Sequence, residues 1–131
     1  MAKCDTTLGV EVDQEIKRRA YAVLKANGMT MSGAIKRMVR LGILEHRIPF
    51  EVTRDPVFAD VGMSDAVASA YGIEKGTFRM SGIADAVVVR MDMTFKNEMR
   101  RYCREMCTNP NNLVHMFLGQ IAFELRLPFV D

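Results

Sequence analysis

The stretch that decides the fold is Val10-Glu11-Val12-Asp13, which returns 79 residues later as Val89-Arg90-Met91-Asp92. The same offset carries Glu45-His46-Arg47-Ile48-Pro49-Phe50 onto Glu124-Leu125-Arg126-Leu127-Pro128-Phe129, and no gap is needed in between. A match kept over this length indicates that one folding unit occurs twice. Two units are too few for a stacked solenoid, so the spacing favours a pair in which each unit packs against the other.

Length and composition fit a small globular protein whose two halves need each other. The chain has 131 residues, of which 49% are hydrophobic and 26% charged, with a formal net charge of +2. A copy of about 46 residues rarely buries enough apolar surface to be stable alone. Residues 6–52 carry a net charge of +3 and residues 86–131 carry +1, whereas the segment 53–85 between them carries −2. Weakly basic copies favour an anionic partner.

The ends and the cysteines bear on where the protein works. The first five residues form no apolar signal segment, and the apolar runs are far shorter than a membrane span. Three cysteines, an odd number, argue against a complete disulfide framework. A cytoplasmic protein is the expectation.

Each copy is predicted to begin with a half-buried strand. Apolar residues alternate with others at a period of two, as in a strand with one face on the core. The inward residues are then Leu8, Val10, Val12, Val87, Val89 and Met91. The outward residues are Thr7, Gly9, Glu11, Ala86, Val88 and Arg90.

Two helices are predicted to follow each strand. Asp13 and Asp92 stand where a carboxylate can accept the unpaired amide bonds of a first helix. The second helix begins after Thr30 or Ser32 in copy one and after Asn109-Pro110 in copy two. Apolar stripes at helical spacing follow these caps. At one point of the second stripe Gly42 corresponds to Ile121, so we expect a close helix crossing there that differs between the copies.

A lone strand leaves its backbone unpaired, so the two strands are expected to pair antiparallel with four helices behind them. The predicted fold is mainly α with a short two-stranded ribbon: tandem ribbon-helix-helix repeats that form an intramolecular pseudodimer. Copy one spans residues 6–52 and copy two spans residues 86–131. The connector, residues 53–85, has no counterpart, and a short helix capped by Ser64 is predicted within it.

Copy one resembles the N-terminal half of RelB/DinJ-family antitoxins. The resemblance rests on Val23–Ser32, which reads V-L-K-A-N-G-M-T-M-S, and on the closing Ile48-Pro49-Phe50. Copy two is similar in its strand, in Lys96 and in Leu127-Pro128-Phe129, but it lacks the glycine turn. The family implies a dimeric DNA-binding repressor whose C-terminal extension wraps a RelE-like ribonuclease toxin. Here only the connector takes the place of that extension.

The ribbon is the candidate DNA-reading surface, because paired strands of this architecture enter the major groove. Of the six outward residues, Arg90 suits guanine, Glu11 suits a cytosine amino group and Val88 suits a thymine methyl. Phosphate contacts would come from the second helices, at Thr30, Ser32, Asn109 and Asn111. Glu11 repels phosphate, however, and Gly9 and Ala86 offer little side chain. The basic residues of the helices look like a nucleic-acid patch, but such residues are more often the solvated face of amphipathic helices.

The connector is the candidate partner-binding segment because it is too apolar for a plain tether. The residues expected to contact a partner, or to dock on the protein itself, are Phe58, Val61, Met63, Val67, Tyr71 and Phe78. A protein-interaction or assembly module that has lost DNA binding is therefore the alternative function.

Enzymatic and metal-binding readings are weaker. Cys103 and Cys107 would share a helix face, with His115 nearby, but a zinc site needs a fourth ligand. Cys103 stands at the position of the core residue Leu24, which favours a buried reduced thiol. No phosphate loop or catalytic pair is present in the sequence. We expect no enzyme, no metal and no cofactor, and either a monomeric pseudodimer or a dimer of pseudodimers.

Overall fold

A computed structural model describes residues 6–50, 64–74 and 79–128. The elements are β1 (Thr6–Asp13), α1 (Gln14–Ala26), α2 (Met31–Glu45), α3 (Asp65–Ala70), β2 (Ala84–Met91), α4 (Met93–Glu105) and α5 (Pro110–Glu124). The molecule is thus mainly helical with one two-stranded antiparallel sheet. Among the described residues, no helix is long and apolar enough to cross a membrane.

The order strand, helix, helix occurs twice, and we call β1-α1-α2 the first unit and β2-α4-α5 the second unit. Both strands have 8 residues, α1 and α4 have 13 each, and α2 and α5 have 15 each. The helices of the second unit begin 79 residues after those of the first. The strand β2 begins at Ala84, inside the segment taken from the sequence as connector, because the ladder pairs Ala84 with Asp13.

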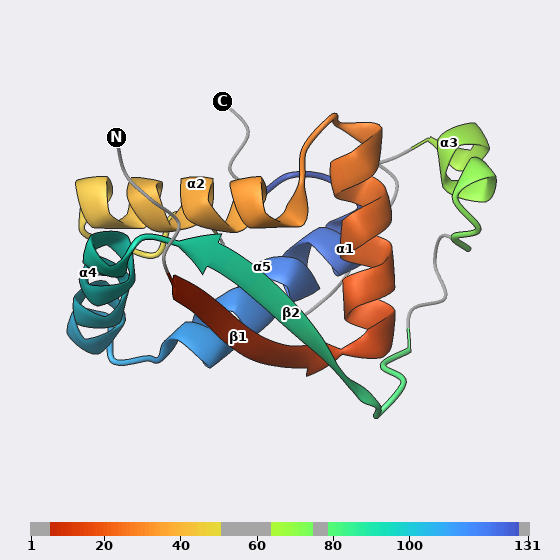
Figure 1. Ribbon diagram of the computed structural model, residues 1–131. Coiled ribbons are helices and arrows are strands. Elements are labelled where there is room, and N and C mark those ends of the chain that lie inside the picture. Colours follow the sequence, from red (N-terminus) through yellow and green to blue (C-terminus); the bar gives the residue numbers. More distant parts are fainter. Residues whose placement is uncertain (1–5, 51–63, 75–78, 129–131) are drawn as a thin grey trace.

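The strands of the two units form one ribbon that covers the helices. Thr6 pairs with Met91 and Asp13 pairs with Ala84, so all eight residues of each strand have partners. In Figure 1, α1 and α4 lie at the two ends of the ribbon and α2 and α5 run between them. All six predicted inward residues are buried against these helices, at 7% exposure or less. The alternation seen in the sequence is therefore the alternation of core and surface.

A polar side chain caps the start of each of the four long helices. For three of these helices the sequence predicts one particular capping residue, and the structure has that residue as the cap. Asp13 and Asp92 cap α1 and α4, and Asn109 caps α5 with proline as the first helical residue. For α2 the cap is Thr30, whose hydroxyl accepts the Gly33 amide hydrogen at 3.0 Å. Each cap satisfies an amide that the helix itself leaves unpaired.

The turn between the two helices has the same backbone form in both units. Gly28 follows α1 with a φ of 70°, in the left-handed region that glycine adopts readily. Cys107 stands at the corresponding position of the second unit and has a φ of 58°. The second unit therefore lacks the glycine but not the turn.

The closing motif Glu-x-Arg-x-Pro also forms the same local structure twice. His46 and Leu125 end α2 and α5 in the left-handed conformation. In each motif the glutamate before this residue and the arginine after it therefore face each other. Arg47 Nε lies 2.8 Å from a Glu45 oxygen, and Arg126 Nε lies 3.2 Å from a Glu124 oxygen. Phe50, just after the first motif, is buried with its ring centroid 5.6 Å from that of Phe117.

The expected difference at Gly42 is present. Tyr102 of α4 lies directly on Gly42 of α2, so closely that a Cβ there would overlap the tyrosine hydroxyl and ring. The hydroxyl donates a hydrogen bond of 2.7 Å to the Arg47 carbonyl oxygen. Burial raises the pKa of Tyr102 to about 12, which keeps this donor protonated.

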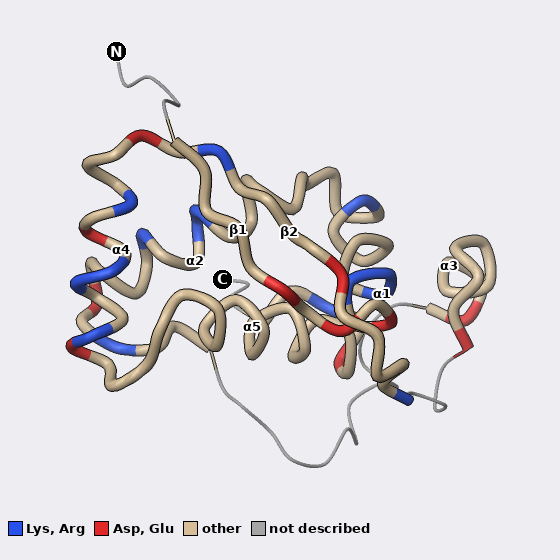
Figure 2. The backbone as a smooth tube through the Cα atoms, turned by 60° about the horizontal axis from the view of Figure 1, so that its bottom comes forward, with Lys and Arg blue, Asp and Glu red and all other residues tan. Residues whose placement is uncertain are grey.

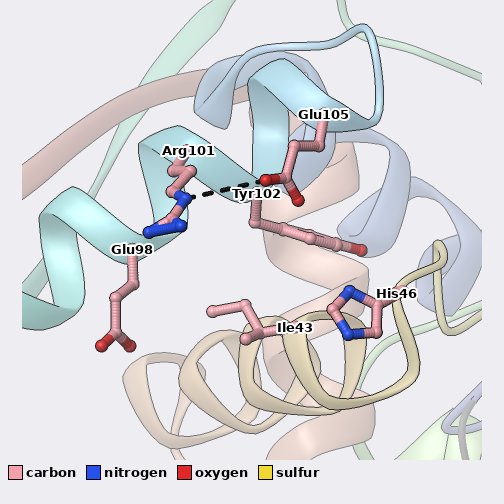
Figure 3. A pocket seen from close by; sticks show the side chains of 6 residues that line it. All are labelled: Ile43, His46, Glu98, Arg101, Tyr102 and Glu105. Atoms are coloured by element: carbon pink, nitrogen blue, oxygen red, sulfur yellow. Dashed lines mark ion pairs between the residues drawn. The ribbon is translucent and has the colours of Figure 1, made fainter.

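Beside Tyr102 an open pocket of about 280 Å³ remains between α2 and α4. Ile43 and His46 reach it from α2 and its end, and the other side chains of Figure 3 come from α4. Arg101 and Glu105 form an ion pair of 3.7 Å at its rim. The backbones of α1 and α5 lie close together over more of their length than those of α2 and α4.

Candidate nucleic-acid interface

The outer face of the ribbon presents the six residues expected from the sequence. All six are exposed, and they meet as three cross-strand pairs. The pairs are Thr7 with Arg90, Gly9 with Val88, and Glu11 with Ala86. Val88, at the centre, is 58% exposed although it is apolar. An exposed face of this width, formed by two antiparallel strands, has the dimensions that a major groove admits.

Two lysines hold the ribbon from its edges. Lys17 of α1 donates to the Ala86 carbonyl oxygen at 2.7 Å, and Lys96 of α4 donates to the Thr7 carbonyl oxygen, also at 2.7 Å. Lys17 and Lys96 are 79 residues apart, and so are Thr7 and Ala86. Each lysine therefore reaches from its own unit to the strand of the other unit and satisfies an edge carbonyl.

Asp13 fixes the end of the ribbon. Besides capping α1, its carboxylate accepts from the Ser81 amide at 3.0 Å, the Ser81 hydroxyl at 3.1 Å and the Gly82 amide at 2.8 Å. Burial acts to raise the pKa of Asp13, but the hydrogen bonds from the amides of Ser81, Gly82 and the first turn of α1 hold that pKa below its ordinary value. The segment that leads into β2 is thus anchored to the first unit.

The second helices begin beside the ribbon, and one of them touches it. Asn111, near the start of α5, accepts the Glu11 amide hydrogen on its Oδ1 at 2.9 Å. The oxygens of Thr30 and Asn109 accept helix amides as caps, so only the hydroxyl hydrogen of Thr30 and the amino group of Asn109 can donate outward. Ser32 is half-buried in the first turn of α2. The four residues proposed for phosphate contact thus lie at two helix starts.

Many of the basic helical residues have structural partners. Arg18 and Arg19 donate to the carbonyl oxygens of Gly72 and Glu74 at 3.1 and 2.7 Å, and Arg19 is only 3% exposed. The guanidinium of Arg40 lies 5.3 Å from the centre of the Phe95 ring. These contacts favour a structural role for part of the basic cluster over a continuous phosphate-binding patch.

Charge along the ribbon is uneven. Figure 2 shows acidic stretches on β1 and β2 at the end nearer α1, and a basic stretch at the opposite end of β2. The acidic end carries Glu11, Asp13 and Asp85, of which Asp85 is 3.4 Å from Lys17. The basic end carries Arg90. A polyanion would therefore meet different fields at the two ends.

The described part of the connector docks on the first unit. Ser64 caps α3 as expected, and Gly72 ends the following turn with a φ of 71°. Ala68 and Ile73 are buried, and Figure 1 shows α3 beside the outer side of α1. Of the residues proposed for partner binding, Val67 is 39% exposed and Tyr71 is half-buried. Phe58, Val61, Met63 and Phe78 lie outside the described residues.

Cys103 and Cys107 do not share a helix face. Cys103 is buried in α4, and burial raises the pKa of its thiol to about 11. Cys107 is exposed and lies beyond the end of α4 at Glu105, because the chain has already turned. Within the part of the chain that is described, no group of three or more His, Cys, Asp or Glu side chains is placed to hold a metal ion.

Several contacts at the ribbon were not anticipated from the sequence. The match between Lys17 and Lys96 is visible in the sequence, but nothing there shows that each reaches the opposite strand. The hydrogen bond from Glu11 to Asn111 joins residues 100 positions apart. Asn111 occupies the position that corresponds to Ser32 of the first unit. This difference in residue type is the sign in the sequence that the two positions could make different contacts.

Comparison with known proteins gives one family. The family model described as RelB antitoxin matches residues 6–74, just over half of the chain. That range covers the first unit and extends through α3. No curated protein matches the chain, and no solved structure does.

Proposed function

The chain belongs to the RelB antitoxin family, and from that premise we propose that it represses transcription by inserting its ribbon into DNA and neutralises a RelE-like toxin. The family gives the chain an antitoxin role in a toxin–antitoxin system, and it is a regulatory family, not an enzymatic one. The two units are proposed to act as the halves of one intramolecular pseudodimer, in place of two identical chains.

The observation that carries the DNA-binding proposal is the ribbon itself. Its six outward residues lie on one exposed face, while the opposite face is anchored in the core. The helix starts at Thr30 and Asn109 flank it with outward donors. A DNA-binding surface needs contacts to base edges and contacts to phosphates, because base contacts give specificity whereas phosphate contacts fix the register on the duplex.

A gel-shift titration against the DNA upstream of the protein's own gene tests this proposal. We expect a salt-sensitive retarded band, because phosphate contacts release counterions. Arg90→Ala should weaken binding by roughly tenfold or more, the size of one lost bidentate base contact. Leu44→Ala is the matched control, since Leu44 is 77% exposed at the far end of α2. No retardation at micromolar protein would refute DNA binding.

The connector supports the toxin-binding part of the proposal. The family match runs past the first unit to residue 74 and so includes α3. Within α3, Ala68 is buried against the protein while Val67 faces outward. A short helix with one docked and one exposed apolar side is suited to contact a partner groove. We propose that Val67 and Tyr71 contact the toxin together with Phe58, Val61, Met63 and Phe78.

Co-expression with the protein encoded by the neighbouring gene tests the toxin partnership. We expect co-purification with the wild-type chain and a lower yield of complex with Val67→Asp. Leu44→Asp is the matched control, because Leu44 is also an exposed apolar residue but lies in α2, outside the connector. Failure of the wild-type chain to retain the neighbouring protein would count against this proposal and would leave DNA binding unaffected.

Light scattering tests the pseudodimer. Pairing of the ribbon within one chain predicts a free protein with the mass of one chain, 14.8 kDa. A mass of two chains at micromolar concentration would favour a dimer of pseudodimers or strands exchanged between chains.

One observation favours a second function, an interaction or assembly module without DNA binding. Glu11 places a carboxylate on the outer face of the ribbon, and Gly9 and Ala86 leave two of the six positions almost without side chain. The gel shift separates the two functions, because the module predicts no retardation while the toxin complex still forms.

A further inference from the structure

We infer that the ribbon reads a DNA site without dyad symmetry, in which Arg90 and Glu11 determine specificity on opposite sides of the centre. The inference rests on the proposed DNA binding and concerns the form of the operator. It follows from the strand register together with the chemistry of the outward side chains.

The register places a pseudo-twofold centre at one cross-strand pair. Gly9 lies opposite Val88, and these two residues are 79 positions apart. The neighbouring outward pairs, Thr7 with Arg90 and Glu11 with Ala86, are exchanged by the same offset. In a dimer of identical chains, positions related in this way carry one residue type, so both halves read the same bases.

Here the related positions differ in every case. Arg90 corresponds to Glu11, Val88 to Gly9, and Ala86 to Thr7. Both charged residues are exposed on the same face and lie on opposite sides of the central pair. The scaffold is therefore close to symmetric while the reading surface is not.

The chemistry of the charged pair disfavours a palindrome. An arginine donates two hydrogen bonds to the O6 and N7 of guanine, whereas a glutamate accepts one from the amino group of cytosine. In a palindromic site, a guanine beneath Arg90 would place a second guanine beneath Glu11. The two guanine acceptors would then face a carboxylate that has no hydrogen to donate. A cytosine in that place removes the repulsion and provides a donor.

The starts of α2 and α5, which flank the ribbon, also differ in how many backbone hydrogens they can donate to a phosphate. The helix α5 begins with Pro110, which has no amide hydrogen, and Asn111 already uses its side-chain oxygen on β1. The helix α2 begins with Met31 and Ser32, both of which carry an amide hydrogen. The α2 side can therefore donate one more backbone hydrogen to a phosphate than the α5 side. The acidic end of the ribbon, with Glu11 and Asp85, adds to the difference.

Selection of bound DNA from a library of random-sequence duplexes tests the inference with the full chain. We expect a consensus with guanine on one side of the centre and no guanine at the dyad-related position. A synthetic duplex that restores the palindrome should bind about tenfold more weakly than the selected one, the size of one mismatched base pair. A dyad-symmetric consensus from the wild-type chain would overturn the inference while leaving DNA binding intact.

The variant Glu11→Arg provides the second arm. It places arginine at both related positions, so the consensus selected by this variant should become palindromic at those two base pairs. The readout is the selected sequence and not the affinity, because a new arginine also attracts phosphate. Leu44→Ser is the control and should select the wild-type consensus. If Glu11→Arg selects the same asymmetric site as the wild type, Glu11 does not determine specificity. If no chain enriches any sequence, both the inference and the proposed DNA binding fail.

Discussion

The contact between α1 and α5 and the contact between α2 and α4 use corresponding positions, yet they are packed differently. In the first, Ile16 lies beside Gly119, with 3.8 Å between its Cδ1 and the place of a Cβ. In the second, the corresponding Phe95 lies beneath Arg40.

A second set of corresponding positions shows a compensating exchange of large and small residues. The first contact has Val23 and Ile121 at positions where the second has Tyr102 and Gly42, and three of these four are at 3% exposure or less as core residues. In the contact of α2 with α4, the large Tyr102 is thus matched by Gly42 on the other helix. Sequence changes between the units are tolerable when the summed volume at a contact stays similar.

The largest expected effect comes from placing the side chain of one contact into the other. Gly42→Ile copies residue 121, but its Cβ would overlap Tyr102, so we expect a loss of about 3 kcal/mol in the free energy of unfolding. The double variant Gly42→Ile with Tyr102→Val copies both partners and should be more stable than the sum of the single effects predicts. Urea denaturation of the four proteins measures this coupling. Additive effects would show that the two positions do not compensate.

The second comparison concerns the two aspartate caps. Asp13 accepts from Ser81 and Gly82 as well as from α1, whereas Asp92 accepts the Phe95 amide at 2.8 Å. We expect Asp13→Ala to lower the free energy of unfolding by about 2 kcal/mol and Asp92→Ala to lower it by about 1 kcal/mol. Thermal denaturation near neutral pH measures both. Equal losses would mean that the contacts to residues 81 and 82 add no stability.

The Asp13 effect should also depend on pH. The folded-state pKa of Asp13 lies below the ordinary value of 3.8, so its stabilising contribution is fully present above that value. The contribution is lost as the pH falls through the folded-state pKa. The difference in stability between wild type and Asp13→Ala should therefore narrow below about pH 4. A difference that stayed constant down to pH 2 would contradict the assignment.

The third comparison concerns the two left-handed turns. A residue with a Cβ is strained at the φ of Cys107, so Cys107→Gly should raise stability by about 1 kcal/mol. Gly28→Ala should lower stability by a similar amount, because the φ of Gly28 is 70°. Chemical denaturation of both variants compares them directly. Stabilisation by Gly28→Ala would show that the turn can relax.

The smallest effects are expected at the closing Glu-Arg pairs. The side chain of Glu45 is 37% exposed and that of Glu124 is 5% exposed. Arg47→Ala removes a solvent-screened partner and should change stability by less than about 0.5 kcal/mol. Arg126→Ala leaves a buried carboxylate that still accepts a hydrogen bond from Gln120, and it should lower stability by about 1 kcal/mol. Raising the salt concentration should reduce the Arg47 effect more than the Arg126 effect.

The parts of the fold that depend on local chemistry could be predicted from the sequence. Alternation around Val10 and Val89 identified the strands, and Asp13, Asp92 and Asn109 identified three helix starts, because caps and periodicity act over a few residues. The sequence left Thr30 and Ser32 open as caps, since both are hydroxyl residues. It could not distinguish docking from exposure in α3, where Ala68 is buried and the larger Val67 is not.

The parts that depend on distant contacts could not be predicted. The outer face of the ribbon was identified residue by residue, but the register that places Gly9 opposite Val88 is a property of the paired strands. The hydrogen bonds of Lys17 and Lys96 likewise join segments 69 and 89 residues apart. Nothing in the local sequence of a lysine indicates which carbonyl it reaches.

The pairing of β1 with β2 has a consequence for synthesis of the protein. Asp13 pairs with Ala84, so the ribbon closes a loop of about seventy residues, and such distant contacts form late because the chain entropy is lost before the contacts are gained. A ribosome that has completed the first unit has made a strand whose edge and whose inward face, Leu8, Val10 and Val12, still lack their second strand. We expect nascent chains halted at position 80 to be digested by a protease that spares the finished protein. The ribbon comes into existence only once its last strand has been translated.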